Sequence, residues 1–151
     1  MTSEELKTKI TELLPTAAFE EGAEWLTVMI EPKEWKVFAE RLHSAPELKF
    51  DYLFCLTGVD WKTHLTVVYH FTSTLFRHTL VVKSKLDRIN PEIESVSHIW
   101  RTAEFNERET YELFGVKFLN HPDLRRLILT DDFEGFPLRK DFEDPVNMIK
   151  L

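Results

Sequence analysis

The densest cluster of ionisable side chains in this sequence begins at residue 107. A Glu-Arg-Glu run at 107–109 is followed by Glu112, and a histidine, an aspartate and two arginines follow before residue 127. Carboxylate, imidazole and guanidinium groups at this density can transfer protons as general acids and bases. The functional interpretation is therefore a small hydrolase or lyase in which Glu109, His121 and Asp123 move protons.

The same side chains also suit a structural network. On a helix, Arg108 would face the glutamates four residues away on either side and form a ladder of ion pairs beside an apolar stripe. Arg125 and Arg126 would supply guanidinium groups for the remaining carboxylates. Because the sequence lacks a nucleophile elbow, a metal triad and a phosphate-binding loop, we favour the structural interpretation.

Composition excludes several other classes of protein. The chain has 151 residues, 43% of them hydrophobic, which fits one globular domain. Its net charge of -7 gives duplex nucleic acid no electrostatic reason to bind. Four widely spaced glycines exclude the glycine-rich nucleotide loops, and the single Cys55 excludes an intramolecular disulfide and a cysteine-based metal cluster. No apolar run approaches the ~20 residues of a membrane span, so we expect a soluble cytoplasmic protein with Cys55 buried and inert.

The first 90 residues alternate between helical and strand-like patterns. The expected elements, in chain order, are a helix over 3–14, a hairpin over 16–31, a helix over 32–44 and strands over 51–59, 64–71 and 75–83. The buried stripe of the second helix is predicted to be Trp35, Phe38, Ala39 and Leu42. Three histidines, His64, His70 and His78, fall in the strand region, and we expect them at the surface because their spacing does not suit one metal ion.

The last third of the chain combines a helix with an unpatterned tail. Residues 95–114 have helical periodicity, Gly115 is a natural C-cap, and 126–129 could form a strand. From Thr130 on, aromatic residues alternate with charges in neither a helical nor a strand period. We expect an extended arm over 130–151 after a domain over 1–129. Whether its aromatic side chains bury against a partner or against their own domain stays open.

Together these elements predict an α+β fold. We expect a two-layer domain whose mixed, mostly antiparallel sheet of about five strands carries helices on one face, followed by the extended C-terminal arm.

The chemistry-rich segment resembles the signature of the C subunit, or 30 kDa subunit, of the proton-pumping NADH:quinone oxidoreductase, respiratory complex I. The shared pattern is Glu-Arg-Glu, two residues, Glu-Leu-Phe, six residues, His, three residues, Arg, one residue, Leu, and the runs 121–127 and 137–142 are also similar. The signature positions in this sequence are Glu107, Arg108, Glu109, Glu112, Phe114, Gly115, His121, Pro122, Asp123, Arg125 and Arg126.

The resemblance implies a non-catalytic hydrophilic subunit of the peripheral arm, on the cytoplasmic side of the membrane, which it touches only through the complex. It implies no catalytic, cofactor-binding or metal-binding residue in this chain, because NADH, FMN, iron–sulfur clusters and quinone are used by the assembled complex. The main partner would be the D subunit, which helps form the quinone site and which we call the quinone-site subunit. The arm would contact it through Phe133, Phe136, Arg139, Lys140 and Phe142.

Related membrane-bound hydrogenases and ferredoxin-linked complexes share much of the motif, so the electron donor stays open. A stand-alone acid/base enzyme and a binding module outside respiration are the remaining hypotheses.

Overall fold

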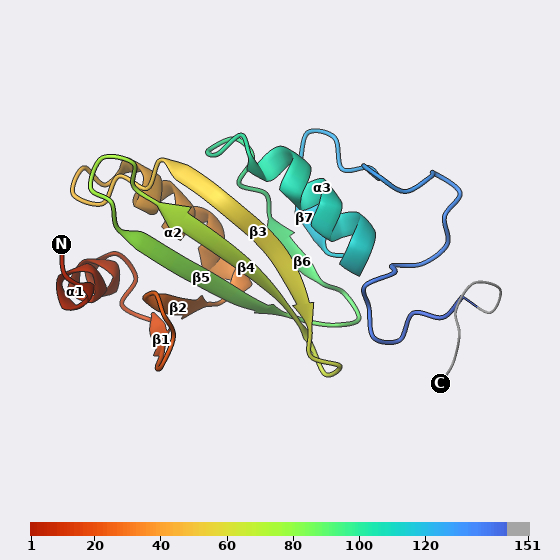
Figure 1. Ribbon diagram of the computed structural model, residues 1–151, viewed down its shortest axis with the longest axis horizontal. Helices are drawn as coiled ribbons and strands as arrows, with labels where there is room; N and C mark the ends of the chain where they lie inside the picture. Colours follow the sequence, from red (N-terminus) through yellow and green to blue (C-terminus); the bar gives the residue numbers. More distant parts are fainter. Residues whose placement is uncertain (145–151) are drawn as a thin grey trace.

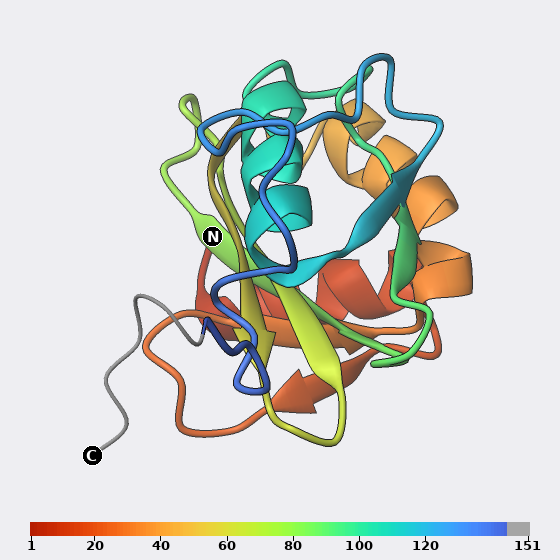
Figure 2. The same cartoon turned by 90° about the vertical axis from the view of Figure 1, so that its right-hand side faces the viewer.

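A five-stranded sheet with all three helices on one face forms the body of the protein (Figures 1 and 2). The computed structural model describes residues 1–144. Its elements are α1 (Ser3–Leu13), β1 (Ala18–Glu20), β2 (Thr27–Ile30), α2 (Pro32–Ser44), β3 (Tyr52–Asp60), β4 (Leu65–Thr72), β5 (Thr79–Leu86), β6 (Glu92–Glu94), α3 (Ala103–Phe114) and β7 (Lys117–Leu119). The strand order is β1-β2-β5-β4-β3, with β2 parallel to β5 and the other neighbours antiparallel. The expected mixed, mostly antiparallel sheet is confirmed.

Local signals in the sequence account for the first elements. Thr2 and Glu5 form a capping box, in which each side chain accepts a hydrogen bond from the other residue's backbone N–H. Pro32 occupies the first turn of α2, where its missing N–H leaves no helical hydrogen bond unmade. The four residues predicted as the stripe of α2 are all buried. One of them, Trp35, lies 4.5 Å, between ring centroids, from Tyr69 of β4.

The connection between β4 and β5 is longer than predicted. The third strand of the 51–83 region begins at Thr79 instead of residue 75, because residues 73–78 close a loop on themselves. Ser73 accepts from Phe76 N–H through its hydroxyl and donates its own N–H to the His78 carbonyl. The two apolar residues that suggested a strand, Leu75 and Phe76, are exposed.

Two further predictions in the C-terminal half are wrong. The helix expected over 95–114 begins only at Ala103, after β6 and a series of turns, and the strand expected over 126–129 is a loop. A second sheet, in which β6 pairs with β7 in parallel, was not predicted. The reasons lie in the contacts that α3 makes with these segments.

The histidines and the cysteine are only partly placed as expected. His78 is buried, with its Nε2 2.7 Å from the Leu48 carbonyl oxygen, so its predicted surface position is wrong. Cys55 is half-buried, which contradicts its predicted burial. Within residues 1–144 the structure groups no three histidine, cysteine or carboxylate side chains as metal ligands. No helix in that range is long and apolar enough to cross a membrane.

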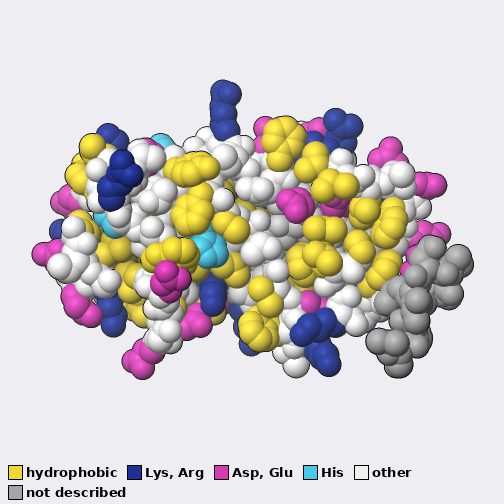
Figure 3. Space-filling view, viewed as in Figure 1, with side chains coloured by type: hydrophobic (Ala, Val, Ile, Leu, Met, Phe, Trp, Pro, Cys, Tyr) yellow, Lys and Arg dark blue, Asp and Glu magenta, His cyan; other side chains and the backbone are white. Residues whose placement is uncertain are grey.

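The opposite face of the sheet, which we call the outer face, carries no helix of residues 1–144. Figure 3 shows hydrophobic side chains gathered over β3, β4 and β5 on this side of the molecule. The ionisable side chains are clustered most densely elsewhere, on α3 and on the chain that follows it.

Candidate functional site

Helix α3 can approach the sheet closely because a glycine faces it. A Cβ atom on Gly58 of β3 would lie 2.8 Å from the ring of Phe114, which is closer than side chains pack. Gly115 then ends the helix with a positive φ of 80°, as its predicted role as C-cap requires. Phe136 of the arm packs on this glycine, so the end of α3 is held between the sheet and the arm.

Glu107 is a fully buried carboxyl group that organises the segment before the helix. Its Oε2 accepts a hydrogen bond from the Ser95 hydroxyl at 2.6 Å, and its Oε1 accepts from Val96 N–H at 2.8 Å. These bonds turn the chain across α3 and explain why the helix does not start at residue 95. Burial raises the pKa of Glu107 to about 7, against the lowering effect of the two hydrogen bonds. Near neutral pH this carboxyl group therefore binds and releases a proton.

His121 lies beside Glu107 with its own hydrogen bonds satisfied. Its Nε2 is 2.9 Å from the Glu104 carbonyl oxygen, and its Nδ1 accepts from Asp123 N–H at 3.0 Å. An Nδ1 that accepts carries no proton, so the neutral ring is protonated at Nε2. The Nε2 atom lies 3.8 Å from Glu107 Oε2. The imidazole thus links α3 to the turn that follows β7.

The proposed proton-transfer set does not converge. His121 has a buried side chain, whereas Glu109 is exposed and Asp123 forms an exposed ion pair with Arg125 at 2.8 Å. In the part of the chain that the structure describes, no hydrogen bond joins Glu109 to either of the other two. The geometry supports the structural interpretation of these residues over the enzymatic one.

Arg108 binds backbone carbonyl groups instead of the glutamates predicted as its partners. Its Nε donates to the Arg125 carbonyl at 3.0 Å, and one terminal nitrogen donates to the Arg126 carbonyl at 2.9 Å. The guanidinium also lies over the Phe105 ring, 5.8 Å from its centroid. The predicted ladder of ion pairs along α3 is wrong, because the loop offers two carbonyl oxygens at the correct spacing for one guanidinium.

Glu112 completes the attachment of this loop. It is fully buried, and its carboxylate accepts the backbone N–H groups of Leu127, Ile128 and Leu129 at 2.9 to 3.1 Å. Three successive N–H groups that point at one carboxylate cannot pair with a strand, which explains the absence of the strand expected at 126–129. We call residues 125–129, held by Arg108 and Glu112, the clamped loop.

The two arginines expected to neutralise α3 have other contacts. Arg125 pairs with Asp123, and Arg126 lies between the rings of Phe133 and Phe136, 5.6 and 5.8 Å from their centroids. The prediction that they bind the acids of α3 is therefore wrong. Arg126 instead joins the clamped loop to the aromatic arm.

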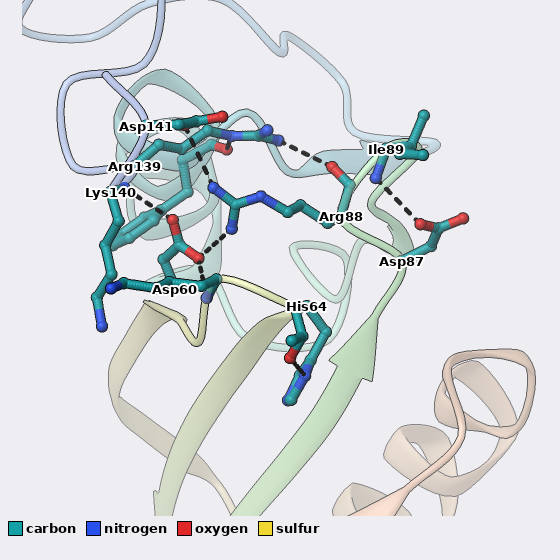
Figure 4. Close-up of polar contacts among 11 residues, drawn as sticks. Asp60, His64, Asp87, Arg88, Ile89, Arg139, Lys140 and Asp141 are labelled. Carbon is teal, nitrogen blue, oxygen red and sulfur yellow. Dashed lines mark hydrogen bonds and ion pairs between the residues drawn. The ribbon is translucent and has the colours of Figure 1, made fainter. Parts of the chain in front are cut away.

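A buried ion pair at the end of the sheet holds the arm (Figure 4). Asp60, at the end of β3, accepts hydrogen bonds from the Arg88 guanidinium, from Lys62 N–H at 2.7 Å and from Lys140 N–H at 2.8 Å. Arg88 also pairs with Asp141 at 3.3 Å. The Arg88 guanidinium holds the pKa of Asp60 well below its usual range, against the effect of burial.

This ion pair was missed in the sequence. Asp60 and Arg88 lie far apart along the chain and match no motif spacing. The one available clue was a charged residue that ends the apolar strand pattern.

The arm residues expected to dock on a partner lie largely against their own chain. The Phe133 and Phe142 rings stack at 6.0 Å, and Phe136 meets Tyr111 of α3 at 6.3 Å. Arg139 donates to the Phe114 carbonyl at 2.6 Å. Lys140 remains exposed. The last part of the predicted arm, 145–151, lies outside the described residues.

The exposed apolar side chains nearest the signature belong to the clamped loop and to its support. Ile128 is 72% exposed and Leu127 37% exposed, although Glu112 fixes the backbone of both. Phe105, which packs under Arg108, is also exposed. The arrangement presents apolar side chains outward from a backbone that is already ordered.

Comparison with known sequences supports the resemblance. The family model described as the respiratory-chain NADH dehydrogenase, 30 Kd subunit, matches residues 28–146. The NADH-quinone oxidoreductase C/D subunit of Phocaeicola vulgatus is 45% identical over 118 residues, which is 77% of this chain and 23% of that protein. The corresponding C subunit of Chloroherpeton thalassium is 42% identical over 111 residues, or 72% of this chain and 46% of that one. The chain thus spans less than half the length of these two relatives.

Solved structures share the fold. A chain of the membrane-bound sulfane sulfur reductase, an archaeal respiratory membrane complex, superposes with a TM-score of 0.79 at 26% identity, covering 93% of this chain and 85% of that one. The trypsin-resistant fragment of Nqo5 superposes with a TM-score of 0.69, also at 26% identity, over 82% of this chain and all of the fragment. The family match covers most of the sheet, α3, the clamped loop and the arm. The chain therefore belongs to the family of the 30 kDa subunit of the respiratory-chain NADH dehydrogenase.

Proposed function

We propose that this chain is a non-catalytic peripheral-arm subunit of a proton-translocating NADH:quinone oxidoreductase and that its clamped loop docks onto the quinone-site subunit. The observation that carries the proposal is the pair of buried charges, Arg108 and Glu112, that fix the loop backbone while its apolar side chains stay exposed. Family membership and the C/D name of the Phocaeicola vulgatus relative support this choice of partner.

The clamped loop has the physical properties of a docking element. Ordering a mobile loop on binding costs affinity, and this loop is ordered before any partner arrives. Ile128 and Leu127 can act as apolar anchors, and the exposed Arg125 can supply a polar rim. Lys140, whose side chain is exposed, would extend the contact onto the arm.

The rest of the proposed role belongs to the assembly. NADH, FMN, iron–sulfur clusters and quinone would be bound by other subunits, and this chain would hold its neighbours at the distances that electron transfer requires. It would lie on the cytoplasmic side of the membrane and contact the membrane only through the complex.

A pair of isoleucine variants tests the docking. The tagged chain is purified from native membranes in mild detergent, and the amount of quinone-site subunit that accompanies it is measured. Ile128→Asp should reduce this co-purified subunit at least tenfold, which corresponds to about 1.4 kcal/mol of docking free energy. Ile89→Asp is the matched control, because Ile89 is 93% exposed and lies on the loop after β5.

Two outcomes contradict the proposal in different ways. If the unmodified chain is recovered alone, it does not belong to the complex. If Ile128→Asp assembles as well as Ile89→Asp, the chain docks through another surface.

A second assignment has a specific observation in its favour. The superposition on the sulfane sulfur reductase chain shows that this fold also occurs in an archaeal respiratory complex of another name. The chain would then be the equivalent subunit of a related hydrogenase-like or ferredoxin-linked complex. Mass spectrometry of the co-purified proteins distinguishes the two assignments, because only the first includes an NADH-binding subunit.

A further inference from the structure

The outer face of the sheet is closely packed around the middle of β4. In β4, Leu65, Val67 and Tyr69 face the helices, yet Thr66 and Val68 on the outer face are only 4% and 7% exposed. The outer-facing residues of β4 are Thr66, Val68, His70 and Thr72, so Val68 is the one apolar residue that interrupts the alternation expected of a strand with one solvated face. The helices of residues 1–144 cover one face of the sheet only, which leaves room for a covering layer over Val68 on the outer face.

Exposed aromatic rings continue this apolar surface at one end of the sheet. Trp25, Tyr52 and Phe54 are all exposed, and they gather around His70 of β4. The Trp25 and Phe54 rings meet edge to face at 6.3 Å. Clusters of large exposed aromatic side chains are typical of protein interfaces.

A shallow groove of about 440 Å³ lies at the other end of the outer face. Its floor includes Met29 and Val59, and Trp61, which is 56% exposed and stacks on His64, forms one wall. Its polar rim is formed by Glu20, Lys83 and Lys85.

The charge at the rim of this groove is opposite in sign to that of the whole chain. Lys83 is paired with Glu20 at 2.8 Å, and Lys85 is exposed beside it, so the rim carries a surplus positive charge on a protein of net charge -7. A partner that buries the apolar floor must therefore present carboxylates at the rim.

We propose that another protein of the complex, distinct from the quinone-site subunit, covers the outer face with an amphipathic helix whose acidic edge meets Lys85. A helix can cover a sheet face as a second layer, and its opposite edges can carry apolar and acidic side chains toward the groove floor and the rim. A second copy of this chain fits less well, because a two-fold contact through the same face would place the lysines of both copies on one interface. The inference rests on the proposed membership of a complex and adds a second docking surface on the far side of the sheet from the helices.

Zero-length coupling of lysines to carboxylates tests this proposal in the intact purified complex. Carbodiimide treatment should join Lys85 to an aspartate or glutamate in a helical peptide of another protein of the complex, identified by mass spectrometry. Lys85→Glu should remove that coupling and reduce the coupled partner at least tenfold, while the quinone-site subunit is retained. Lys36→Glu is the matched control, because Lys36 is an exposed lysine of α2, away from the outer face.

The outcomes separate this inference from the proposed function. The inference is overturned if Lys85 couples only to a second copy of the chain, or if Lys85 is as reactive in the complex as in the isolated chain. Either result leaves docking to the quinone-site subunit intact. Recovery of the chain without any partner would overturn the proposed function itself.

Discussion

The burial of Glu107 predicts a specific dependence of stability on pH. Its pKa of about 7 in the folded protein lies above its ordinary value of 4.5, so the folded state holds the proton more tightly than the unfolded state. The resulting stabilisation is complete below pH 4.5 and is lost as the pH rises through 7. The full loss is about 3 kcal/mol, of which about 2 kcal/mol falls between about pH 5.5 and pH 8.

Replacing Glu107 with glutamine should remove this dependence. Glutamine cannot ionise, and its amide can still accept from Val96 N–H while it donates to the Ser95 hydroxyl oxygen. We expect Glu107→Gln to match the original protein below about pH 4.5 and to be more stable by about 3 kcal/mol near pH 8, with about 2 kcal/mol of this difference developing above about pH 5.5. Urea unfolding curves at several pH values in this range measure the difference.

Comparing the pH dependence of stability of the original protein and of Glu107→Gln separates the contribution of Glu107 from that of other groups that titrate. Burial and the nearby Lys83 lower the pKa of His70, so this histidine adds stability as the pH rises, but it does so in both proteins. Glu109→Gln is the control, because Glu109 is exposed on the same helix and its removal should leave the pH dependence unchanged. If Glu107→Gln keeps the full pH dependence, the buried carboxyl group is not the source and this explanation is wrong.

Three further substitutions test the contacts around α3. Glu112→Gln should lower the free energy of unfolding by about 2–3 kcal/mol and speed hydrogen exchange at amides 127–129; unchanged exchange would show that the carboxylate does not hold the loop. Asp60→Asn should cost about 1–3 kcal/mol, because Arg88 keeps only its exposed partner Asp141 and the N–H groups of Lys62 and Lys140 lose a charged acceptor. It should also open the basic residues of the arm to trypsin, and equal digestion of both proteins would contradict this role. Gly115→Ala should cost about 1–3 kcal/mol in urea unfolding, because a side chain at φ 80° is strained; a neutral effect would contradict the cap.

The parts of the fold that the sequence predicted are those with local causes. The capping box at Thr2, the proline at the start of α2 and the glycine at the end of α3 each act within one turn of chain. The hairpin of β1 and β2 likewise depends on a nearby turn. Such elements form where their own residues favour them.

The parts that it missed depend on contacts between distant segments. The start of α3 is set by Glu107, which binds the backbone of Val96, and the loop at 126–129 is set by Glu112. Hydrophobic periodicity continued through both segments and favoured a helix and a strand. The buried carboxylates determined the outcome, because an unmet buried charge costs more than a few residues of favourable propensity contribute.

At the candidate site, too, the sequence predicted where the residues lie but not what they bind. Every signature residue lies on α3, on its cap or on the chain that follows and packs beside it, as the sequence placed them. Their expected partners were charged side chains, but Arg108 and Glu112 bind backbone carbonyl and N–H groups instead. Spacing alone cannot reveal a backbone partner, because every residue of the loop offers the same groups.

Attachment through backbone atoms leaves the side chains of the clamped loop available for contact with a partner. Because Glu112 and Arg108 hold main-chain groups, these hydrogen bonds place no requirement on the side chains of Leu127 and Ile128, which are 37% and 72% exposed and can face a partner. The loop can therefore change its side chains to suit a different neighbour without losing its shape. Substituting both positions with alanine should leave the hydrogen exchange of their amides unchanged while it weakens docking, whereas Glu112→Gln should alter both. A loss of amide protection in the alanine variant would show that packing of these side chains, and not the carboxylate, fixes the loop.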